Sequence, residues 1–299
     1  MSPDALRSGF VALAGRPNVG KSTLLNRLVG AKVAITASAP QTTRTRVQGV
    51  LTLPDAQIVF IDTPGIHDPR HRLGERMVAQ AREALKDADV ILAIFDASVP
   101  LTEEDRLTAR HVRQAGKPAV AALNKADRVT PDEAEARGRE VRDLAPFTSV
   151  VPVSATRGAG IDRLIEAIVA LVPQGPQYFP PDMVTDQPEQ FLVREFIREQ
   201  AIALTREELP HSVAVEIEEF EERSADLVYI RATIHVERES HKKMLIGRGG
   251  RMLKEIGRRA RAEIEVLLRR RLYLDLWVKT SKDWRQRDEM IRAFYPEQR

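Results

Sequence analysis

The sequence predicts an α/β domain with a doubly wound, mostly parallel sheet, followed by a smaller α+β domain. Short apolar runs alternate with helical patterns from Phe10 to about Leu171, which is typical of βα units. Five prolines then fall between Pro173 and Pro188 and exclude regular structure. Beyond them the pattern changes. We therefore expect domain limits of 1–172 and 191–299, joined by a proline-rich linker at 173–190.

Five apolar runs of the first domain are predicted strands, each with a polar or glycine-rich carboxyl end. They span residues 10–15, 57–65, 90–98, 119–127 and 150–155. Amphipathic segments between them, such as 21–30 and 76–88, are predicted helices. Ligands of such sheets bind beyond the carboxyl ends of the strands, so the ligand site is expected there.

The second domain is expected to fold in the order α-β-β-α-α-β around one three-stranded sheet. A helix at 190–204 precedes two strands, and the later one places Val228, Ile230, Ala232, Ile234 and Val236 on one face. In the last strand, Leu272, Leu274, Leu276 and Val278 share a face. Tyr273 and Trp277 fall on the opposite face, where the rings either stack on a base or pack against the C-terminal tail helix.

The composition excludes several kinds of site and indicates where the protein is located. The 299 residues include no cysteine, which excludes disulfides, thiolate metal sites and cysteine nucleophiles. This composition, with no signal-peptide pattern and no apolar run of membrane-spanning length, predicts a cytoplasmic protein. Residues 189–240 carry six basic and thirteen acidic side chains, whereas 241–299 carry seventeen basic and eight acidic ones. The basic block is either a solvated face or a nucleic-acid contact.

The segment "GRPNVGKS" at 15–22 matches the phosphate-loop pattern G-x-x-x-x-G-K-[ST] between a strand and a helix. Glycines let the backbone N–H groups curl around phosphate, Lys21 bridges the β- and γ-phosphates, and the Ser22 hydroxyl ligates Mg²⁺. The helix N-terminus also attracts anions. The predicted phosphate-binding residues are Gly15, Arg16, Pro17, Asn18, Val19, Gly20, Lys21, Ser22 and Thr23.

The segment "NKAD" at 124–127 predicts guanine as the base. The Asp127 carboxylate can accept hydrogen bonds from guanine N1–H and its exocyclic amine, which adenine does not offer. Lys125 is expected along the base plane, and Asn124 is expected to tie this loop to the phosphate loop. Ser154, Ala155 and Thr156 fit a backbone contact to the guanine carbonyl.

The segment "DTPG", comprising Asp62, Thr63, Pro64 and Gly65, follows a predicted strand. Asp62 is expected to hold the Mg²⁺ shell through water, and the Gly65 N–H to meet the γ-phosphate. The segment "PQTTRTR" offers Thr42 or Thr43 as a hydroxyl ligand, of which we favour Thr43. The predicted catalytic residues are thus Lys21, Thr43 and Gly65, and the predicted metal ligands are Ser22, Thr43 and Asp62. Four such motifs in order are typical of translation-factor-like GTPases.

Ile66 occupies the position directly after the glycine of "DTPG", where Ras-type GTPases place a glutamine that orients water. An isoleucine side chain cannot form a hydrogen bond, so we expect slow intrinsic GTP hydrolysis. One substitute is a monovalent cation such as K⁺ held by Asn18. The alternative is that Asn18 only shapes the loop.

A second glycine loop, "GRGG" at 247–250, fits the G-x-x-G loop of KH domains, which clamps a single-stranded nucleic-acid backbone. Leu253, Ile256, Ala260, Ile264 and Leu267 recur at helical spacing and are expected to face the sheet. The alternative is a solvated basic helix. The predicted RNA-binding residues are Lys242, Lys243, Gly247, Arg248, Gly249, Gly250, Arg251, Lys254 and Arg258.

Together "GRPNVGKS", "PQTTR", "DTPG", "NKAD", the proline-rich segment and "IGRGG" resemble the bacterial Era GTPases over almost the whole chain. The resemblance implies a GTP/GDP-binding domain followed by a type II KH domain. It also implies binding near the 3′ end of 16S rRNA and a role in maturation of the 30S ribosomal subunit. A monomer is expected, with a peripheral membrane-associated fraction as in some relatives. The alternatives are an RNA-binding assembly factor that GTP only tunes, and a membrane-surface GTPase.

Overall fold

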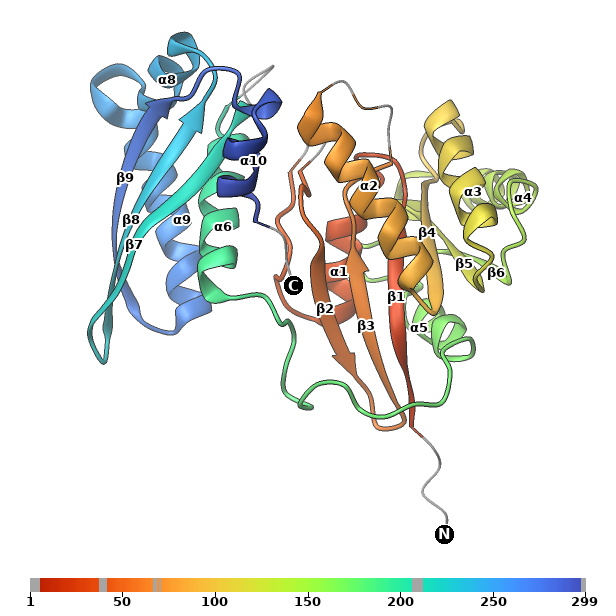
Figure 1. Ribbon diagram of the computed structural model, residues 1–299. Coiled ribbons are helices and arrows are strands. Elements are labelled where there is room, and N and C mark those ends of the chain that lie inside the picture. Colours follow the sequence, from red (N-terminus) through yellow and green to blue (C-terminus); the bar gives the residue numbers. More distant parts are fainter. Residues whose placement is uncertain (1–5, 38–41, 67–68, 70, 206–211, 297–299) are drawn as a thin grey trace. The chain divides into compact units, whose positions relative to one another are not determined.

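The computed structural model describes residues 6–37, 42–66, 69, 71–205 and 212–296, which fold into two compact units (Figure 1). The first unit comprises Met1–Ala34, Thr43–Arg70 and Gly74–Asp186. The second comprises Ile35–Thr42, His71–Leu73 and Gln187–Arg299. Of the residues in the motifs named above, Pro40 and Gln41 lie outside the described ranges.

The first unit is built on a six-stranded sheet in the order β2-β3-β1-β4-β5-β6. Its strands are β1 (Arg7–Ala14), β2 (Val47–Thr52), β3 (Ala56–Asp62), β4 (Val90–Asp96), β5 (Ala119–Asn124) and β6 (Ser149–Pro152). Its helices are α1 (Lys21–Val29), α2 (Arg72–Asp87), α3 (Glu103–Ala115), α4 (Pro131–Arg142) and α5 (Ile161–Val169), with a short 3-10 turn η1 (Ala126–Arg128). Only the edge strand β2 pairs antiparallel.

Helices cover both faces of this sheet. Strands β3, β4 and β5 are buried at every residue, as expected for continuous apolar runs inside a parallel sheet. Side chains of α2, α3 and α4 share one core cluster with β1, β3, β4 and β5. On the other face α1 packs so closely on β2 that a Cβ at Gly49 would lie 2.8 Å from Leu25 and Val29. The predicted doubly wound, mostly parallel sheet is confirmed.

Four strands end with residues of interest at the same edge of the sheet. Strand β1 ends at Ala14, directly before the phosphate loop, and β3 ends at Asp62. Strands β4 and β5, which pair in parallel, end opposite each other at Asp96 and Asn124. This edge therefore gathers the predicted nucleotide motifs, as expected for carboxyl ends of parallel strands.

The proline-rich segment contains no helix and no named strand between residues 173 and 186, as its composition predicts. It is nevertheless fixed to the first unit. The Pro173 carbonyl accepts from Ser8 N at 2.9 Å, and Gln57 Oε1 accepts from the backbone of both Tyr178 and Phe179. The compact units consequently divide between Asp186 and Gln187, inside the segment that the sequence assigns to a linker.

The second unit follows the predicted order α-β-β-α-α-β. It contains α6 (Glu189–Ala203), β7 (Ala214–Ser224), β8 (Leu227–Val236), α8 (Glu239–Ile246), the short turn η2 (Arg248–Gly250), α9 (Arg251–Leu268) and β9 (Arg271–Thr280). The turn η3 (Trp284–Gln286) and helix α10 (Asp288–Phe294) form the tail. The sheet order is β7-β8-β9, in which β7 pairs antiparallel and β9 parallel to β8.

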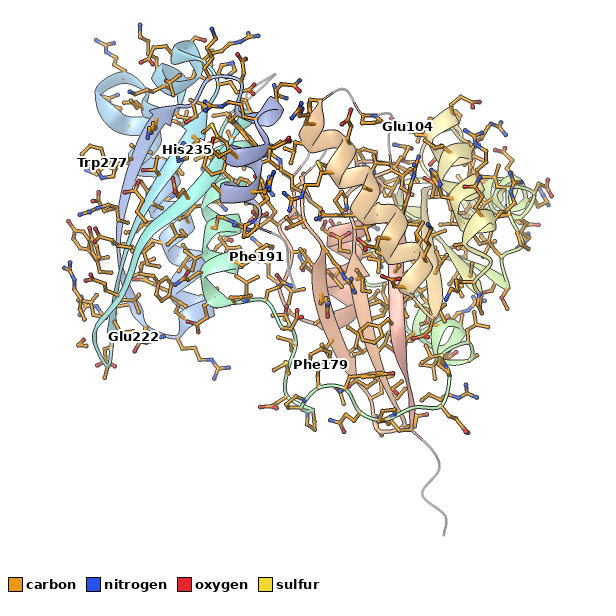
Figure 2. The ribbon with its side chains drawn as sticks, in the orientation of Figure 1. Glu104, Phe179, Phe191, Glu222, His235 and Trp277 are labelled. Atoms are coloured by element: carbon orange, nitrogen blue, oxygen red, sulfur yellow. The ribbon has the colours of Figure 1, made fainter. Side chains whose placement is uncertain are left out.

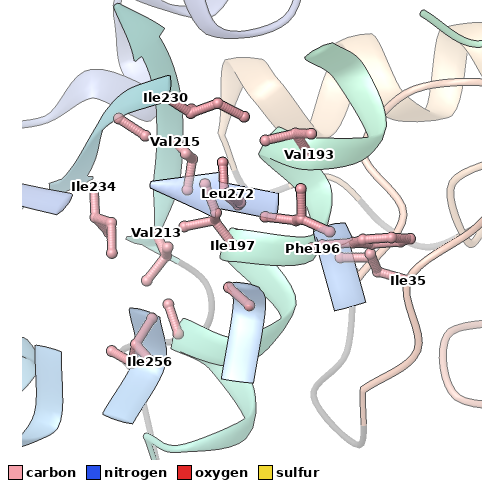
Figure 3. Packing of buried hydrophobic residues seen from close by; sticks show 14 of the residues in the cluster. Ile35, Val193, Phe196, Ile197, Val213, Val215, Ile230, Ile234, Ile256 and Leu272 are labelled. Carbon is pink, nitrogen blue, oxygen red and sulfur yellow. The ribbon is translucent and has the colours of Figure 1, made fainter. Parts of the chain in front are cut away.

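Helices α6 and α9 pack on one face of this sheet and enclose the core of the second unit (Figure 3). The inward residues of β8 and the Ile256, Ala260 and Ile264 side chains of α9 are fully buried. Leu274, Leu276 and Val278 pack against the same core while remaining partly exposed. An early segment of the chain joins it, because Ile35 packs beside Phe196 of α6.

The tail packs at one end of the opposite face of the sheet. The Phe294 ring lies 4.5 Å from His235 on β8, and Trp284 is fully buried. Tyr273 and Trp277 of β9 are instead 61% and 60% exposed. The interpretation in which these two rings pack against the tail helix is therefore wrong.

Among the described helices of either unit, none combines the length and the apolar character needed to cross a bilayer.

Candidate functional site

The phosphate loop connects β1 to α1 and depends on two glycines. A Cβ at Gly20 would lie 2.4 Å from the Asn124 amide nitrogen, and one at Gly15 would lie 2.7 Å from the Ile94 carbonyl oxygen. Gly20 also has φ 97°, a left-handed conformation that favours glycine. The Asn18 backbone has φ 65°, and asparagine is among the few other residues that adopt this region readily. Asn18 thus has a structural explanation that needs no bound cation.

The Lys21 ammonium group lies inside this loop. Its Nζ donates to the carbonyl oxygens of Gly15 at 3.0 Å and Arg16 at 3.1 Å. Burial lowers the pKa of Lys21 to about 8, and the nearby Asp62 carboxylate opposes this shift. A buried cation among carbonyl groups stabilises an anion more strongly than a solvated lysine would.

The three predicted metal ligands, Ser22, Thr43 and Asp62, converge on one point. Ser22 Oγ donates to Asp62 Oδ2 at 2.6 Å, Thr43 Oγ1 donates to the same oxygen at 3.0 Å, and the two hydroxyls lie 2.8 Å apart. Asp62 is fully buried, and burial raises the pKa of its carboxyl group. Its Oδ1 is also buried and has no hydrogen-bond partner within the described ranges. Of the two candidate threonines, Thr43 has its hydroxyl here.

The "DTPG" segment leaves β3 and packs against the phosphate loop. A Cβ at Gly65 would lie 2.9 Å from the Pro17 backbone nitrogen, so a larger residue would displace one of the two loops. The Thr63 hydroxyl donates to the Leu13 carbonyl at 2.8 Å. Ile66 is 1% exposed and packs in the apolar core beneath. Its side chain therefore lies in the core and not at the surface of the site.

Asn124 joins three segments at the base-recognition end. Its Nδ2 donates to the Val19 carbonyl of the phosphate loop at 2.8 Å, and its Oδ1 accepts from Ala155 N at 3.1 Å. The predicted tie to the phosphate loop is thus present, and it also fixes the loop that carries Ser154, Ala155 and Thr156. Lys125 has φ 62°, and its Nζ donates to the Asn18 carbonyl at 2.9 Å.

Asp127 lies in η1 beside the "SAT" loop and remains partly accessible. A hydrogen bond from the Ser154 side chain lowers the pKa of its carboxyl group, helped by the Arg157 and Arg128 charges. Arg157 Nε lies 3.5 Å from Asp127 Oδ2. The carboxylate is therefore ionised at neutral pH, the state that accepts two hydrogen bonds.

Three further side chains contact residues of the predicted nucleotide site, and the sequence analysis did not identify them. Asp96, at the end of β4, accepts from Lys125 Nζ at 2.6 Å. Arg27 of α1 donates to the carbonyl oxygens of Ala155 at 2.9 Å and Thr156 at 2.7 Å. Asp105 of α3 accepts from Arg16 at 3.1 Å. Asp96 could have been identified from the sequence, because it ends a predicted strand at the edge of the sheet that gathers the nucleotide motifs. Arg27 and Asp105 lie on helices, and no motif marks them.

The second glycine loop joins α8 to α9. Gly247, Gly249 and Gly250 all have φ between 62° and 76°, in the left-handed region. Gly247 is constrained further, because a Cβ would lie 2.7 Å from Met252 Cβ and 3.0 Å from its backbone nitrogen. Gly249 and Gly250 have open space around them. Arg248, between these glycines, is exposed.

A groove of about 750 Å³ runs from this loop between α9 and β9. Arg251, Lys254, Arg258 and Arg261 contribute charge to it, and the remaining lining residues are Gly250, Leu253, Glu255, Gly257, Leu272, Tyr273, Leu274 and Leu276. The bidentate contact from Arg258 lowers the pKa of Glu255 to about 2, with Arg259 adding to it. Lys242 and Lys243 lie on α8 and are not among the groove residues.

Fold and site together define a P-loop GTPase domain followed by a KH domain. A family model described as "50S ribosome-binding GTPase" matches residues 10–125, and one described as "KH domain" matches residues 208–285.

Curated relatives cover nearly the whole chain. The GTPase Era of Halothermothrix orenii is 49% identical over 286 residues, which is 96% of this chain and 97% of the relative. The GTPase Era of Carboxydothermus hydrogenoformans is 48% identical over 289 residues, with the same coverage. The chain therefore belongs to the Era family of GTPases, and it is an enzyme that hydrolyses GTP.

Two solved Era structures have the same fold. One is Era in complex with MgGDPNP and nucleotides 1506–1542 of 16S ribosomal RNA, with a TM-score of 0.94 and 43% identity. The other is a variant of Aquifex aeolicus Era bound to GDP and tetrafluoroaluminate, with a TM-score of 0.93 and 43% identity. Each comparison covers 97% of this chain and 99% of the relative.

The burial of Lys21 predicts that nucleotide affinity falls as pH rises through about 8. Phosphate stabilises the charged ammonium, so binding raises this pKa, and above pH 8 the complex must take up a proton. Between about pH 7 and pH 8.5 we expect a roughly fourfold loss of GDP affinity from Lys21 alone. Calorimetric titration at both pH values measures it.

The matched control is Lys21→Arg, whose guanidinium stays charged across this range. Titration of the nucleotide itself affects both proteins equally, so the difference between the two slopes isolates Lys21. Equal slopes for the two proteins would contradict the assignment.

Proposed function

We propose that this chain couples GTP binding and hydrolysis in its first unit to binding of 16S rRNA, near its 3′ end, by its KH domain. In this role it assists maturation of the 30S ribosomal subunit. The carrying observation is the convergence of Lys21, Ser22, Thr43 and Asp62 at one sheet edge that also presents Asn124 and Asp127. The Era structure bound to a GTP analogue and a 16S rRNA fragment supports the RNA partner.

Each predicted residue has a role in this proposal. The phosphate loop from Gly15 to Thr23 surrounds the phosphates with N–H groups, and the Lys21 ammonium contacts the β- and γ-phosphate oxygens. The Gly65 N–H donates to the γ-phosphate, so that the close contact of Gly65 with Pro17 sets the distance between the two loops. Asp127 and Lys125 recognise guanine, and Ser154, Ala155 and Thr156 approach its carbonyl group.

The donor set fits Mg²⁺. Hard oxygen ligands suit this ion, and the buried Asp62 Oδ1, which has no hydrogen-bond partner among the described residues, is an acceptor that a hydrated cation would satisfy. Ser22 and Thr43 would hold the ion directly, and Asp62 through water. When bound, Mg²⁺ supplies positive charge that neutralises the β- and γ-phosphates.

Base selection by Asp127 gives a direct test of the GTP site. Asp127→Asn replaces an acceptor by an amide, which cannot accept both guanine hydrogen bonds, so we expect roughly a hundredfold weaker GTP binding. Xanthosine triphosphate, which presents a carbonyl in place of the guanine amine, should bind the variant better than GTP does. Competition titration with labelled nucleotide measures both affinities.

The control is Asp132→Asn, the same chemical change at an exposed position of α4. It should leave GTP affinity unaltered. Wild-type protein that binds ATP as tightly as GTP would refute guanine selection by this site.

Slow intrinsic hydrolysis follows from Ile66, whose buried side chain leaves water positioning to other groups. We propose K⁺, held with the help of Asn18, as one such group. On this proposal GTP turnover is at least about tenfold faster in potassium than in sodium buffer. Asn18→Gly, which keeps the left-handed backbone but lacks the side chain, should lose this preference. Equal rates in the two buffers would leave Asn18 with only its loop-shaping role.

RNA binding is assigned to the groove between α9 and β9. Four cationic side chains along one wall can neutralise phosphates, and the apolar floor can contact bases. The apolar stripe of α9 is buried against the sheet, which leaves no apolar face on this helix for a lipid surface. This observation favours RNA over a membrane-surface role. A peripheral membrane contact and a monomeric state stay predictions, to be measured by liposome flotation and sedimentation.

Coupling between nucleotide and RNA is supported by the path of the chain. Residues 35–37 and Thr42 belong to the second unit, where Thr36 N donates to Glu199 at 2.8 Å and buried Arg198 donates to the Thr42 carbonyl. The next residue, Thr43, has its hydroxyl in the nucleotide site. Any change at Thr43 on hydrolysis therefore pulls on a segment anchored in the KH unit.

The loop glycines provide a test of the RNA site. Gly247→Ala forces Met252 and the start of α9 to move, so we expect about tenfold weaker binding of an oligonucleotide from the 3′ end of 16S rRNA. Gly249→Ala meets open space and adds only backbone strain, so its loss should be about threefold at most. Fluorescence anisotropy measures both affinities, with a GTP analogue and with GDP bound.

GTP affinity of the same variants checks that the first unit is folded. Unchanged RNA affinity in Gly247→Ala, or equal losses in both variants, would contradict the groove assignment. If the wild-type affinity is identical with the GTP analogue and with GDP, the coupling proposal fails while RNA binding stands.

A further inference from the structure

Asp96 is a buried carboxylate at the base-recognition end of the nucleotide site, and it lies outside the four nucleotide motifs. It ends β4 opposite Asn124 of β5, and the Ala97 N–H donates to the Asn124 carbonyl at 2.8 Å. Its side chain is 6% exposed. Burying a carboxylate is unfavourable unless its oxygens accept hydrogen bonds, so the partners of each oxygen indicate what this residue does.

The two carboxylate oxygens of Asp96 have different partners. Oδ1 accepts from the Ser98 backbone N–H at 2.9 Å and from the Ser98 hydroxyl at 2.6 Å. These bonds close a local turn at the end of β4, which is a common structural role of aspartate. Oδ2 instead accepts from Lys125 Nζ at 2.6 Å. One oxygen therefore shapes the loop after β4, and the other contacts the "NKAD" segment.

The loop after Asp96 is also held at its far end. It leads to α3, whose first turn carries Glu104 (Figure 2). There the Thr102 hydroxyl accepts from the Asp105 N–H, and the Asp105 carboxylate accepts from the Thr102 N–H at 2.9 Å. This cap does not involve Asp96. The contact between Asp96 and Lys125 is therefore not needed to hold the loop.

Lys125 is fixed at both ends of its side chain. Its backbone has φ 62°, a left-handed conformation that is unfavourable for most residues other than glycine. Its Nζ donates to Asp96 and to the Asn18 carbonyl of the phosphate loop, the latter at 2.9 Å. The methylene stem must therefore run between a fixed backbone and a fixed ammonium group. A free lysine side chain would lose rotamer freedom when a base packs on it, whereas this one is already ordered.

The ion pair between Asp96 and Lys125 is present at neutral pH. Burial alone would raise the pKa of the Asp96 carboxyl group, but hydrogen bonds from Lys125 and Ser98 outweigh burial and place this pKa below its usual range. The carboxylate is therefore ionised when the protein binds nucleotide.

We propose that Asp96 is a positioning residue for guanine binding, whose Oδ2 holds the Lys125 ammonium group so that the lysine stem lies ready along the base. This inference rests on the assignment of Lys125 to the guanine base in the proposed function. Asp96 itself touches no part of the nucleotide in this role. Its loss therefore lowers affinity for the nucleotide and leaves the chemistry at the γ-phosphate unaltered.

Asp96→Asn distinguishes the two oxygens. The amide oxygen can keep the Ser98 contacts, while the NH₂ group replaces Oδ2 and cannot accept from Lys125. We expect about tenfold weaker GDP binding, measured by titration with fluorescently labelled GDP. In GTP turnover the same loss should raise KM, with kcat at saturating GTP within about twofold of the wild-type value.

Ser98→Ala is the matched control. It removes a hydrogen bond of the same length, 2.6 Å, from Oδ1 and leaves the Lys125 contact in place. GDP affinity should therefore change by less than about twofold. Asp96→Glu keeps the negative charge, and the flexible lysine side chain can follow the displaced carboxylate. This variant should retain most of the affinity that Asp96→Asn loses.

A double-mutant cycle tests whether Asp96 acts through Lys125. Lys125→Met keeps an unbranched stem without the ammonium group, and we expect it to weaken GDP binding. Because Asp96 then has no ammonium group to hold, adding Asp96→Asn to Lys125→Met should cause no further loss.

Four results would overturn the proposal. They are unchanged GDP affinity in Asp96→Asn, an equal loss in Ser98→Ala, an equal loss from Asp96→Asn with and without Lys125→Met, and a fall in kcat at saturating GTP. The last result would make Asp96 a support of the whole site. If Lys125→Met binds GDP as tightly as the wild type, the assignment of Lys125 to the base is itself wrong, which is a failure of the proposed function.

Discussion

The nucleotide site depends on a buried carboxylate, that of Asp62. Burying a carboxylate is unfavourable unless other groups compensate, and here the Ser22 and Thr43 hydroxyls and the Lys21 ammonium do so. The same groups are the ones to which we assign the binding of GTP and Mg²⁺. The folded protein thus holds these side chains in position through hydrogen bonds that a bound cation would replace. Little reorganisation of the site is therefore required on binding.

Thr43 lies where the chain passes from the second unit into the first. Its hydroxyl belongs to the Asp62 cluster in the first unit, and the preceding residue, Thr42, is bonded through its carbonyl to buried Arg198 of the second. A peptide bond cannot stretch, so the two environments are mechanically joined at this point. On the proposed coupling, a nucleotide-dependent shift of the Thr43 hydroxyl reaches the second unit without a long chain of side-chain contacts.

The sequence predicted the features that short-range physics determines. Strand edges, the two glycine loops and the alternation in β8 and β9 follow from local patterns, so Asp62, Asn124 and the inward leucines could be placed in advance. Contacts between distant segments could not. Arg27 reaches the 155–156 carbonyls, and the proline-rich segment binds Gln57, only because the fold brings them together. Nothing local marks those residues, and the sequence accordingly separated residues 173–186 from the first unit.

The two glycine loops are suited to phosphate in physically different ways. The first adds a buried, partly desolvated lysine and the start of α1, which suits one compact, highly charged triphosphate. The second has exposed arginines and open space around Gly249 and Gly250, which suits an extended backbone that enters and leaves.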